Sequence, residues 1–254
     1  WLFPLLGVAL TSLRPASDLA QGNYFGMPSG IAWENYIYIF TETPIGQYMV
    51  NSLWVTIPTV IGAVSLSLMT GFALAVYGFR ANILVFFMFV AGNFVPFQIL
   101  MVPVRDMTLQ LGMYDTWYGL ALFHIAFQTG FCTLFMRNFI KSLPFELIEA
   151  ARVEGASWGQ IYRRIVMPLS GPILATAAIL KFLVMYNQYL WPLMVVQEEG
   201  YRPVMVGLQY FFQLNVAWGE VMAYLSLITV PVLAFYLYLQ KAFIASIAST
   251  GVKG

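Results

Sequence analysis

Five apolar segments constrain this chain more than any other feature of its sequence. Each has about 19 residues or more, which is long enough for a helix to cross the roughly 30 Å hydrocarbon core of a bilayer. The segments are approximately 49–76, 83–104, 117–135, 172–196 and 221–239. Only 9% of the 254 residues are charged, whereas soluble domains carry roughly 25%. The sequence therefore predicts an all-α, polytopic protein that is covered mostly by lipid.

A sixth, shorter apolar segment opens the sequence at residues 1–13. As a helix it would reach only about 20 Å, which is less than the thickness of the hydrocarbon core. We interpret it as the outer end of a first span whose inner half is missing, because the residues around Arg14 make a poor signal-peptide cleavage site. The prediction is one domain, 1–254, with six transmembrane helices, the first of them truncated.

Basic residues are divided unequally between the two sides that these spans define. One side holds Arg80, Arg137, Lys141, Arg152, Arg163, Arg164, Lys241 and Lys253. The other side holds Arg14, Arg105 and Arg202. Short loops rich in Lys and Arg stay in the cytoplasm. We therefore expect the loop at 137–171, the C-terminus and the missing N-terminus to be cytoplasmic.

Counted from residue 1, the third and fifth of the six apolar segments are interrupted by polar side chains. Asn93 and Gln98 lie in the third, 83–104, and Lys181, Asn187 and Gln188 lie in the fifth, 172–196. Polar groups at membrane depth are costly and usually face protein or a water-filled path. Two interpretations of the amides stay open at this point: they bond neighbouring helices, or they line a pore.

The loop at 137–171 carries signals for two short helices. Ser142 is a good N-cap with Pro144 in the following turn, Gly155 can end that helix, and Ser157 can cap a second one. The sequence thus predicts a helix–turn–helix under the membrane. Such an element either docks in a groove of a partner or lies on the lipid headgroups as a connector.

The first of these helices has the composition of a docking helix. Ala150 and Ala151 allow close approach of another backbone, and Leu147 and Ile148 add apolar area. Glu149 can pair with a basic group of the partner. These residues favour docking, and the wider pattern around them strengthens that interpretation.

The wider pattern has fixed positions between residues 149 and 169. They are Glu149-Ala150-Ala151, Gly155, Ile165 and Pro168-Leu169. This spacing resembles the EAA loop of permease subunits in bacterial ABC importers, with Met167 where the family usually has Leu. Because the pattern is long and falls in the loop that charge places in the cytoplasm, it favours docking to an ATPase over a connector.

Other parts of the chain are similar to the maltose-type, carbohydrate-uptake branch of that family. They are Asn51-Ser52, the segment at 112–116, the segment at 187–193 and the terminal segment at 251–254. The resemblance implies the MetI-like permease fold in the bacterial inner membrane. It also implies a homologous second permease, two ABC ATPase subunits and an extracytoplasmic solute-binding protein that delivers a carbohydrate.

The resemblance also suggests which residues act on these partners. The candidates for ATPase coupling are Leu147, Ile148, Glu149, Ala150, Ala151, Arg152 and Gly155. The tail Gly251, Val252, Lys253 and Gly254 either inserts between the ATPase subunits or is inert. The turn Glu198, Glu199 and Gly200 either contacts the solute-binding protein or is an ordinary polar turn.

Aromatic rings stack on sugars and amides bond their hydroxyls, so residues of both kinds are candidates for the substrate path. They are Asn93, Gln98, Tyr186, Asn187, Gln188, Tyr189 and Trp191. Lys181 either attracts an anionic sugar or extends its ammonium to the cytoplasmic interface, and its place near that end of the span favours the second.

The sequence has no site of its own for ATP chemistry. It lacks the G-x-x-x-x-G-K-[ST] phosphate loop and any metal-ligand spacing of His, Cys and carboxylates, so ATP and magnesium are expected in partner subunits. The chain is thus predicted to be non-catalytic, with no cofactor.

The rival class is a secondary transporter or channel, but such proteins usually carry carboxylates at the membrane midplane and often internal sequence repeats. Neither feature occurs here.

Overall fold

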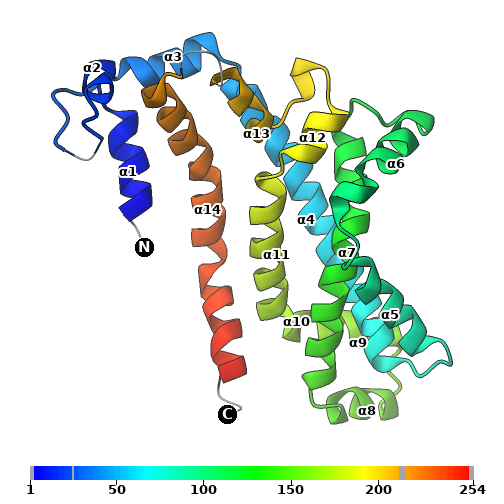
Figure 1. Cartoon of the computed structure of the whole chain (residues 1–254). Coiled ribbons are helices and arrows are strands. Elements are labelled where there is room, and N and C mark those ends of the chain that lie inside the picture. Colours follow the sequence, from blue (N-terminus) through cyan, green and yellow to red (C-terminus); the bar gives the residue numbers. More distant parts are fainter. Residues whose placement is uncertain (1–2, 25, 212–215, 252–254) are drawn as a thin grey trace.

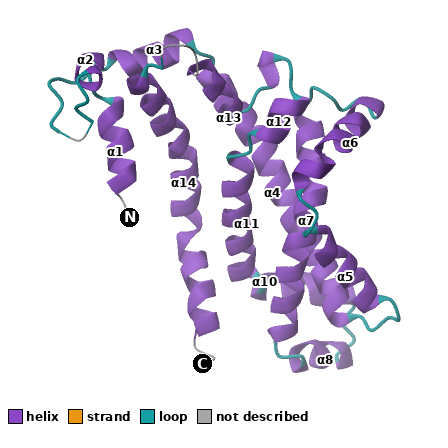
Figure 2. Ribbon diagram, in the orientation of Figure 1, coloured by secondary structure: helices purple, strands orange, loops and turns teal. Residues whose placement is uncertain are grey.

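The computed structural model describes residues 3–24, 26–211 and 216–251, and in these ranges it contains helices and no strands (Figure 2). The prediction of an all-α chain is confirmed. The long helices are α4 (Ile45–Val76), α7 (Trp117–Ser142), α11 (Gly171–Tyr186) and α14 (Trp218–Gly251). The shorter ones are α1 (Phe3–Ser12), α2 (Ala16–Ala20), α3 (Glu34–Glu42), α5 (Asn82–Gly92), α6 (Phe97–Gln110), α8 (Glu146–Val153), α9 (Trp158–Ile161), α10 (Met167–Leu169), α12 (Leu190–Val195) and α13 (Val204–Gly207).

Three of these helices are long and apolar enough to cross a membrane: α4, α7 and α14 over its first 24 residues. Two further spans arise if each of two bent pairs crosses as one unit. One pair is α5 with α6, bent by 97°, and the other is the α9–α10 segment with α11, bent by 70°. The short apolar helix α1 has 10 residues. The fold is that of a multi-pass membrane protein, and the count of six spans stays a prediction.

The third apolar segment was expected as one helix over 83–104, and this is wrong. The chain leaves α5 after Gly92 and starts α6 at Phe97. Pro96 has no N–H group and disfavours helix in the residue before it, which accounts for the break. The Asn93 side chain donates a hydrogen bond to the Phe89 carbonyl at 2.7 Å and so satisfies one of the last carbonyls of α5.

The fifth segment, expected over 172–196, is divided in the same way. Helix α11 ends at Tyr186 and α12 begins at Leu190. Asn187 donates to the Leu183 carbonyl at 2.8 Å, which repeats the arrangement at the end of α5. Helices α5 and α11 are therefore each followed by an asparagine whose side chain donates a hydrogen bond to the carbonyl four residues earlier in that helix.

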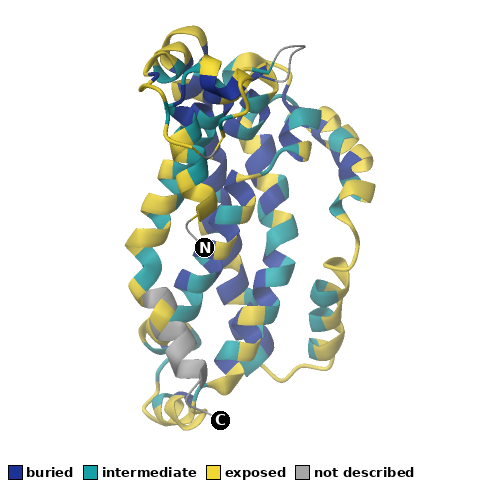
Figure 3. Ribbon diagram, turned by 60° about the vertical axis from the view of Figure 1, so that its left-hand side comes forward, coloured by how far each residue is buried: buried dark blue, intermediate teal, exposed yellow. Residues whose placement is uncertain are grey.

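Helices α4 and α7 pack along each other and form the centre of the bundle, and buried residues concentrate there (Figure 3). Ser67 Oγ donates to the Thr129 carbonyl at 3.0 Å across this contact. Gly71 allows close packing at this contact, because a Cβ built on it would lie 2.7 Å from Met136 Cβ. Small and hydroxyl-bearing residues thus bring the two helices together, as is usual in membranes.

The bundle has two different ends. Helix α8 and the last turns of α14 lie at one end, whereas α2, α3 and α12 lie at the other (Figure 1). Helices α11 and α14 pack against each other and α11 also packs against α4, so the fold brings the fifth span to the central pair.

Candidate functional site

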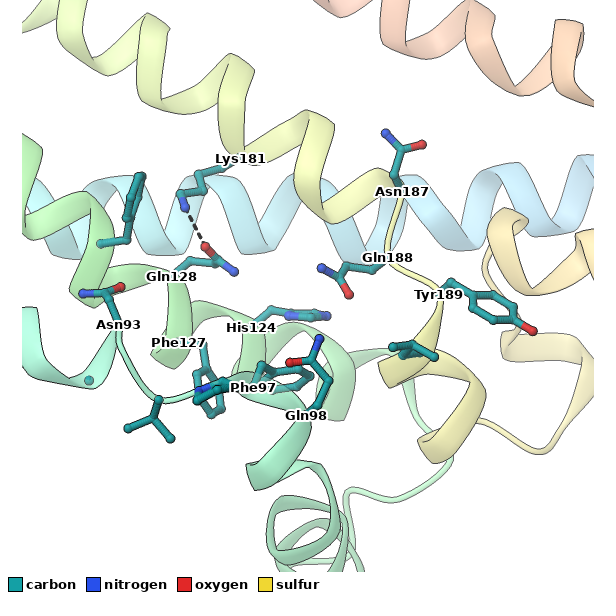
Figure 4. Close-up of a pocket in the computed structure, with 15 residues that line it drawn as sticks. Asn93, Phe97, Gln98, His124, Phe127, Gln128, Lys181, Asn187, Gln188 and Tyr189 are labelled. Carbon is teal, nitrogen blue, oxygen red and sulfur yellow. Dashed lines mark hydrogen bonds between the residues drawn. The ribbon is translucent and has the colours of Figure 1, made fainter.

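A polar pocket of about 530 Å³ lies between the two helix breaks and the middle of α7 (Figure 4). Its lining is Gly92, Asn93, Val95, Pro96, Phe97, Gln98, His124, Phe127, Gln128, Phe131, Lys181, Asn187, Gln188, Tyr189 and Leu190. Irregular backbone at membrane depth is tolerated where it borders a cavity or protein, because its polar groups need partners. The pocket has a size typical of small-molecule sites.

Five of the seven residues that the sequence proposed for a substrate path line this pocket. They are Asn93, Gln98, Asn187, Gln188 and Tyr189. Gln98 and Gln188 lie near His124, whereas the Asn187 side chain points away from these groups (Figure 4). The Tyr189 hydroxyl accepts a hydrogen bond from Gln209 Nε2 at 2.6 Å, which holds the ring just before the start of α12.

Tyr186 and Trp191 are placed elsewhere. They are 2% and 0% exposed, and neither belongs to the lining of the pocket. The Trp191 ring packs edge-on against Phe97, with 5.6 Å between ring centroids. These two side chains form part of the packing around the pocket, and sequence reasoning did not separate them from the lining residues beside them.

Sequence reasoning missed the contribution of α7 to the pocket. His124 and Gln128 lie four residues apart and therefore share one face of the helix, as Phe127 and Phe131 also do. This spacing was the signal that could have found these residues. His124 is 3% exposed, and its Nε2 has no hydrogen-bond partner.

The expectation that Lys181 extends to the cytoplasmic interface is wrong. Its Nζ donates a hydrogen bond to Gln128 Oε1 at 2.6 Å and lies 3.9 Å from the centroid of the Phe131 ring. Gln128 is near the middle of α7, so the ammonium stays at membrane depth (Figure 4). A lysine at such a depth costs roughly 3 kcal/mol, which makes a functional role the default explanation.

The docking loop has the two predicted helices, with one correction at its start. Ser142 is the last residue of α7, and its Oγ donates to the Phe139 carbonyl instead of capping α8. Gly155 ends the first helix as expected, with a φ of 85° that other residues rarely adopt. Ser157 caps α9, where it forms a capping box with Gln160.

Helix α8 presents one face outward and packs the other inward. Ile148 is 3% exposed and Ala151 packs against the same core cluster, so these two anchor the helix. Glu149, Ala150 and Leu147 are exposed and available to a partner. The sequence had grouped all five together.

Two exposed apolar residues beside them were missed. Phe145 is 50% exposed and Val153 is 88% exposed. They flank the outward face of α8, so the exposed surface of this helix is more apolar than the sequence suggested. Their helical spacing from Glu149, four residues on either side, was the signal that could have found them.

Aromatic rings attach this loop to the end of α4. The ring centroids of Trp158 and Tyr77 are 4.9 Å apart, and those of Phe72 and Tyr162 are 5.4 Å apart. The guanidinium of Arg152, at the end of α8, lies 4.5 Å above the Trp158 ring. Packed side chains therefore connect α8 to the end of α4.

The turn at 198–200, which follows α12, is held by hydrogen bonds on both of its sides. Asn51 Nδ2 donates to the Gly200 carbonyl at 2.8 Å, and the Tyr48 hydroxyl bonds Glu199 Oε1 at 2.9 Å. Asp115 Oδ1 accepts hydrogen bonds from the backbone N–H of Gln197 and Glu198, at 2.8 and 3.0 Å. Both Glu198 and Glu199 are exposed, so the turn is a fixed acidic surface.

The C-terminal tail falls largely outside the described residues. Gly251 is the last residue of α14, and Val252, Lys253 and Gly254 lie outside the part of the chain that the structure describes. Their proposed contact with the ATPase subunits stays a prediction.

Comparison with known proteins gives a consistent result. Residues 48–249 match the family described as binding-protein-dependent transport system inner membrane component. The arabinooligosaccharides transport system permease protein AraQ of Halalkalibacterium halodurans is 33% identical, over 100% of this chain and 91% of its own length. The trehalose transport system permease protein SugB of Mycobacterium tuberculosis is 30% identical, over 100% of this chain and 93% of its own length.

The fold is also found in a solved structure. A chain of a bacterial ABC transporter involved in the import of the acidic polysaccharide alginate matches with a TM-score of 0.83 at 24% identity, covering 95% of this chain and 90% of the other. Together with the family match over most of the sequence, these relatives settle the classification. The chain belongs to the family of binding-protein-dependent transport system inner membrane components.

Proposed function

We propose that this chain is the membrane-spanning, non-catalytic subunit of an ATP-driven importer for a carbohydrate. The observation that carries the proposal is α8, an exposed helix with the Glu149-Ala150-Ala151 pattern, supported from behind by Ile148 and braced on α4. Two relatives are named for the transport of arabinooligosaccharides and trehalose, which supports a carbohydrate as cargo.

The proposed partners follow from this assignment. A homologous second permease completes the translocation path, two ABC ATPase subunits bind at the α8 end, and a solute-binding protein docks at the opposite end. The excess of basic residues at the α8 end supports a cytoplasmic position for this loop and for both termini. The fixed acidic turn at 198–200 is the proposed contact with the solute-binding protein.

Coupling rests on the chain of packed residues behind α8. Closure of the ATPase dimer pushes the outward face of α8, and the Arg152–Trp158–Tyr77 contacts pass this displacement to α4. Because α4 and α7 are tightly packed, the two helices move as one body. The pocket on the far side of α7 then changes its access, which is the step that moves the sugar.

The pocket suits a carbohydrate. Gln98, Gln128 and Gln188 offer amide donors and acceptors for hydroxyl groups, and the Phe127 and Tyr189 rings offer flat apolar faces.

The test uses the purified complex with its ATPase and solute-binding protein. Glu149→Lys reverses the charge of the docking surface, and we expect substrate-stimulated ATPase activity and uptake to fall about 30-fold or more, as for loss of a charge pair at an interface. Glu154→Lys is the matched control, because it makes the same charge change at the end of α8 where a cation is favourable.

Two outcomes would contradict the proposal. One is purification of a functional homo-oligomer without any ATPase. The other is a Glu149→Lys complex whose uptake and ATPase activity equal those of Glu154→Lys.

A further inference from the structure

Lys181 is a buried cation that has no anionic partner among the residues that the structure describes. It is 6% exposed, and in the part of the chain that the structure describes no carboxylate oxygen lies within 4.0 Å of its Nζ. Its hydrogen-bond acceptor is the neutral Gln128 Oε1. A neutral amide offsets only part of the loss of hydration of an ammonium, since buried charges normally need a paired charge.

The ammonium is placed on the wall of the pocket. Gln128 Oε1 lies 2.6 Å from Nζ (Figure 4). Nζ also lies over the Phe131 ring, 3.9 Å from its centroid, so two of its sides are occupied by protein. An ammonium has three N–H donors, and this arrangement uses one of them on a side-chain oxygen. Lys181 and Gln128 both belong to the lining, so the charge faces the same space as the polar groups around it.

The remaining lining agrees with an anionic ligand. None of its fifteen described residues carries a carboxylate, so the pocket has a positive charge and no acidic group to repel an anion. His124 contributes a second buried nitrogen, Nε2, without a hydrogen-bond partner. Amides from Gln98 and Gln188 complete a lining that can also bond hydroxyl groups.

We infer that the cargo is an anionic carbohydrate, whose carboxylate or phosphate group pairs with Lys181 while its hydroxyls bond the surrounding amides. This inference rests on the proposed function and narrows its substrate class. The sugar would supply the counter-charge that the fold leaves out, so Lys181 would bind cargo in transit and release it when the pocket changes shape. A carboxylate of the protein beside Lys181 would pair with the ammonium permanently and compete with the ligand for it.

The experiment compares matched ligands in the complete reconstituted complex. The pairs are oligogalacturonate with a galactose oligomer of equal length, and glycerol 3-phosphate with glycerol, each loaded on the solute-binding protein. We expect uptake of the charged compound in one of the two pairs. Uptake of oligogalacturonate would indicate that Lys181 binds a carboxylate, and uptake of glycerol 3-phosphate would indicate that it binds a phosphate. Lys181→Gln should lower this uptake at least 10-fold, whereas Lys181→Arg, which keeps the charge, should retain most of it.

Stability and ATPase readouts separate this role from a structural one. Lys181→Met removes the charge at similar volume, and we expect its complex to melt no earlier than the wild type, because no protein anion loses its partner. A lower melting temperature of Lys181→Met, with equal loss of uptake of the charged and neutral ligands, would show that Lys181 pairs with another subunit and would overturn the inference.

Uptake of only the neutral ligands, unchanged in Lys181→Gln, would overturn the inference and leave the proposed importer function intact. Failure of every sugar to stimulate ATPase activity would count against the proposed function itself.

Discussion

The docking loop and the polar pocket are built in opposite ways. The loop at 137–171 is one continuous stretch whose helices begin and end through local interactions, such as the capping box at Ser157 and the positive φ of Gly155. The pocket is assembled from three segments that are far apart in sequence, around Asn93, Gln128 and Asn187. The outward face of α8 in this loop is exposed, whereas the pocket lies between α7 and the two helix breaks.

This difference predicts how each region responds to mutation. A change in the scaffold that holds the pocket should alter the stability of the whole chain, because α4 and α7 share their core along most of their length. A change in the loop should alter its local order and the coupling to ATP, with little effect on global unfolding. The following variants are designed to separate these two responses.

The largest effect is expected at Gly71, in the contact between α4 and α7. A Cβ there would lie 2.7 Å from Met136 Cβ and 2.9 Å from the backbone nitrogen of Arg137, and backbone cannot move aside easily. Gly71→Ala should therefore destabilise the chain by about 1–3 kcal/mol, as overpacking usually does. The measurement is the thermal unfolding midpoint of the purified complex.

Gly46 provides a matched control in the same helix. A Cβ on Gly46 meets nothing within 4 Å, so Gly46→Ala should be neutral or stabilise by up to about 1 kcal/mol through its better helix propensity. Equal melting temperatures for the two variants would show that the contact between α4 and α7 does not bear on global stability.

A smaller and more local effect is expected at Gly155. Its φ of 85° is strained for L-residues with a side chain by roughly 1–2 kcal/mol, although a Cβ there would meet open space. Gly155→Ala should misplace the end of α8 and lower the ratio of sugar transported to ATP hydrolysed, while the melting temperature stays close to that of the wild type. Gly155→Asn should retain more coupling, because Asn tolerates this conformation.

The opposite pattern would break the comparison. If Gly155→Ala lowered the melting temperature as much as Gly71→Ala did, the loop would belong to the same cooperative unit as the bundle.

The same difference explains what the sequence predicted and what it did not. The start of α9 at Ser157 and the end of α8 at Gly155 depend on residues a few positions away, so both were found correctly. The break at 93–96 was missed because the apolar run continues through it, although Asn93 and Pro96 were visible. Hydropathy reports whether a segment suits lipid, and it does not report where the helix in that segment stops.

The pocket was only partly predictable for a related reason. Asn93 and Gln98 drew attention because amides are rare at membrane depth, and both do line it. The position of the Lys181 ammonium depends on Gln128, which is 53 residues away in sequence. Nothing in the local sequence indicates that pairing, so only the packed structure shows that the side chain turns towards Gln128 and the pocket instead of towards the interface.

The smallest effect is expected at the capping box of α9. Ser157 Oγ accepts from Gln160 N at 3.3 Å and Gln160 Oε1 accepts from Ser157 N at 2.7 Å, so Ser157→Ala removes one of two reciprocal bonds and costs the helix about 1 kcal/mol. Amide hydrogen exchange over 146–161 should become faster, while exchange in α4 and α7 stays unchanged.

Ser142→Ala is the control for this last variant. Ser142 is also an exposed serine of the loop, but its hydroxyl donates to the Phe139 carbonyl inside α7 and caps no helix. Exchange in α8 should therefore stay the same when it is lost. Faster exchange of α8 in Ser142→Ala would restore the original expectation that Ser142 is the N-cap of that helix, and it would move the start of the docking element to the end of α7.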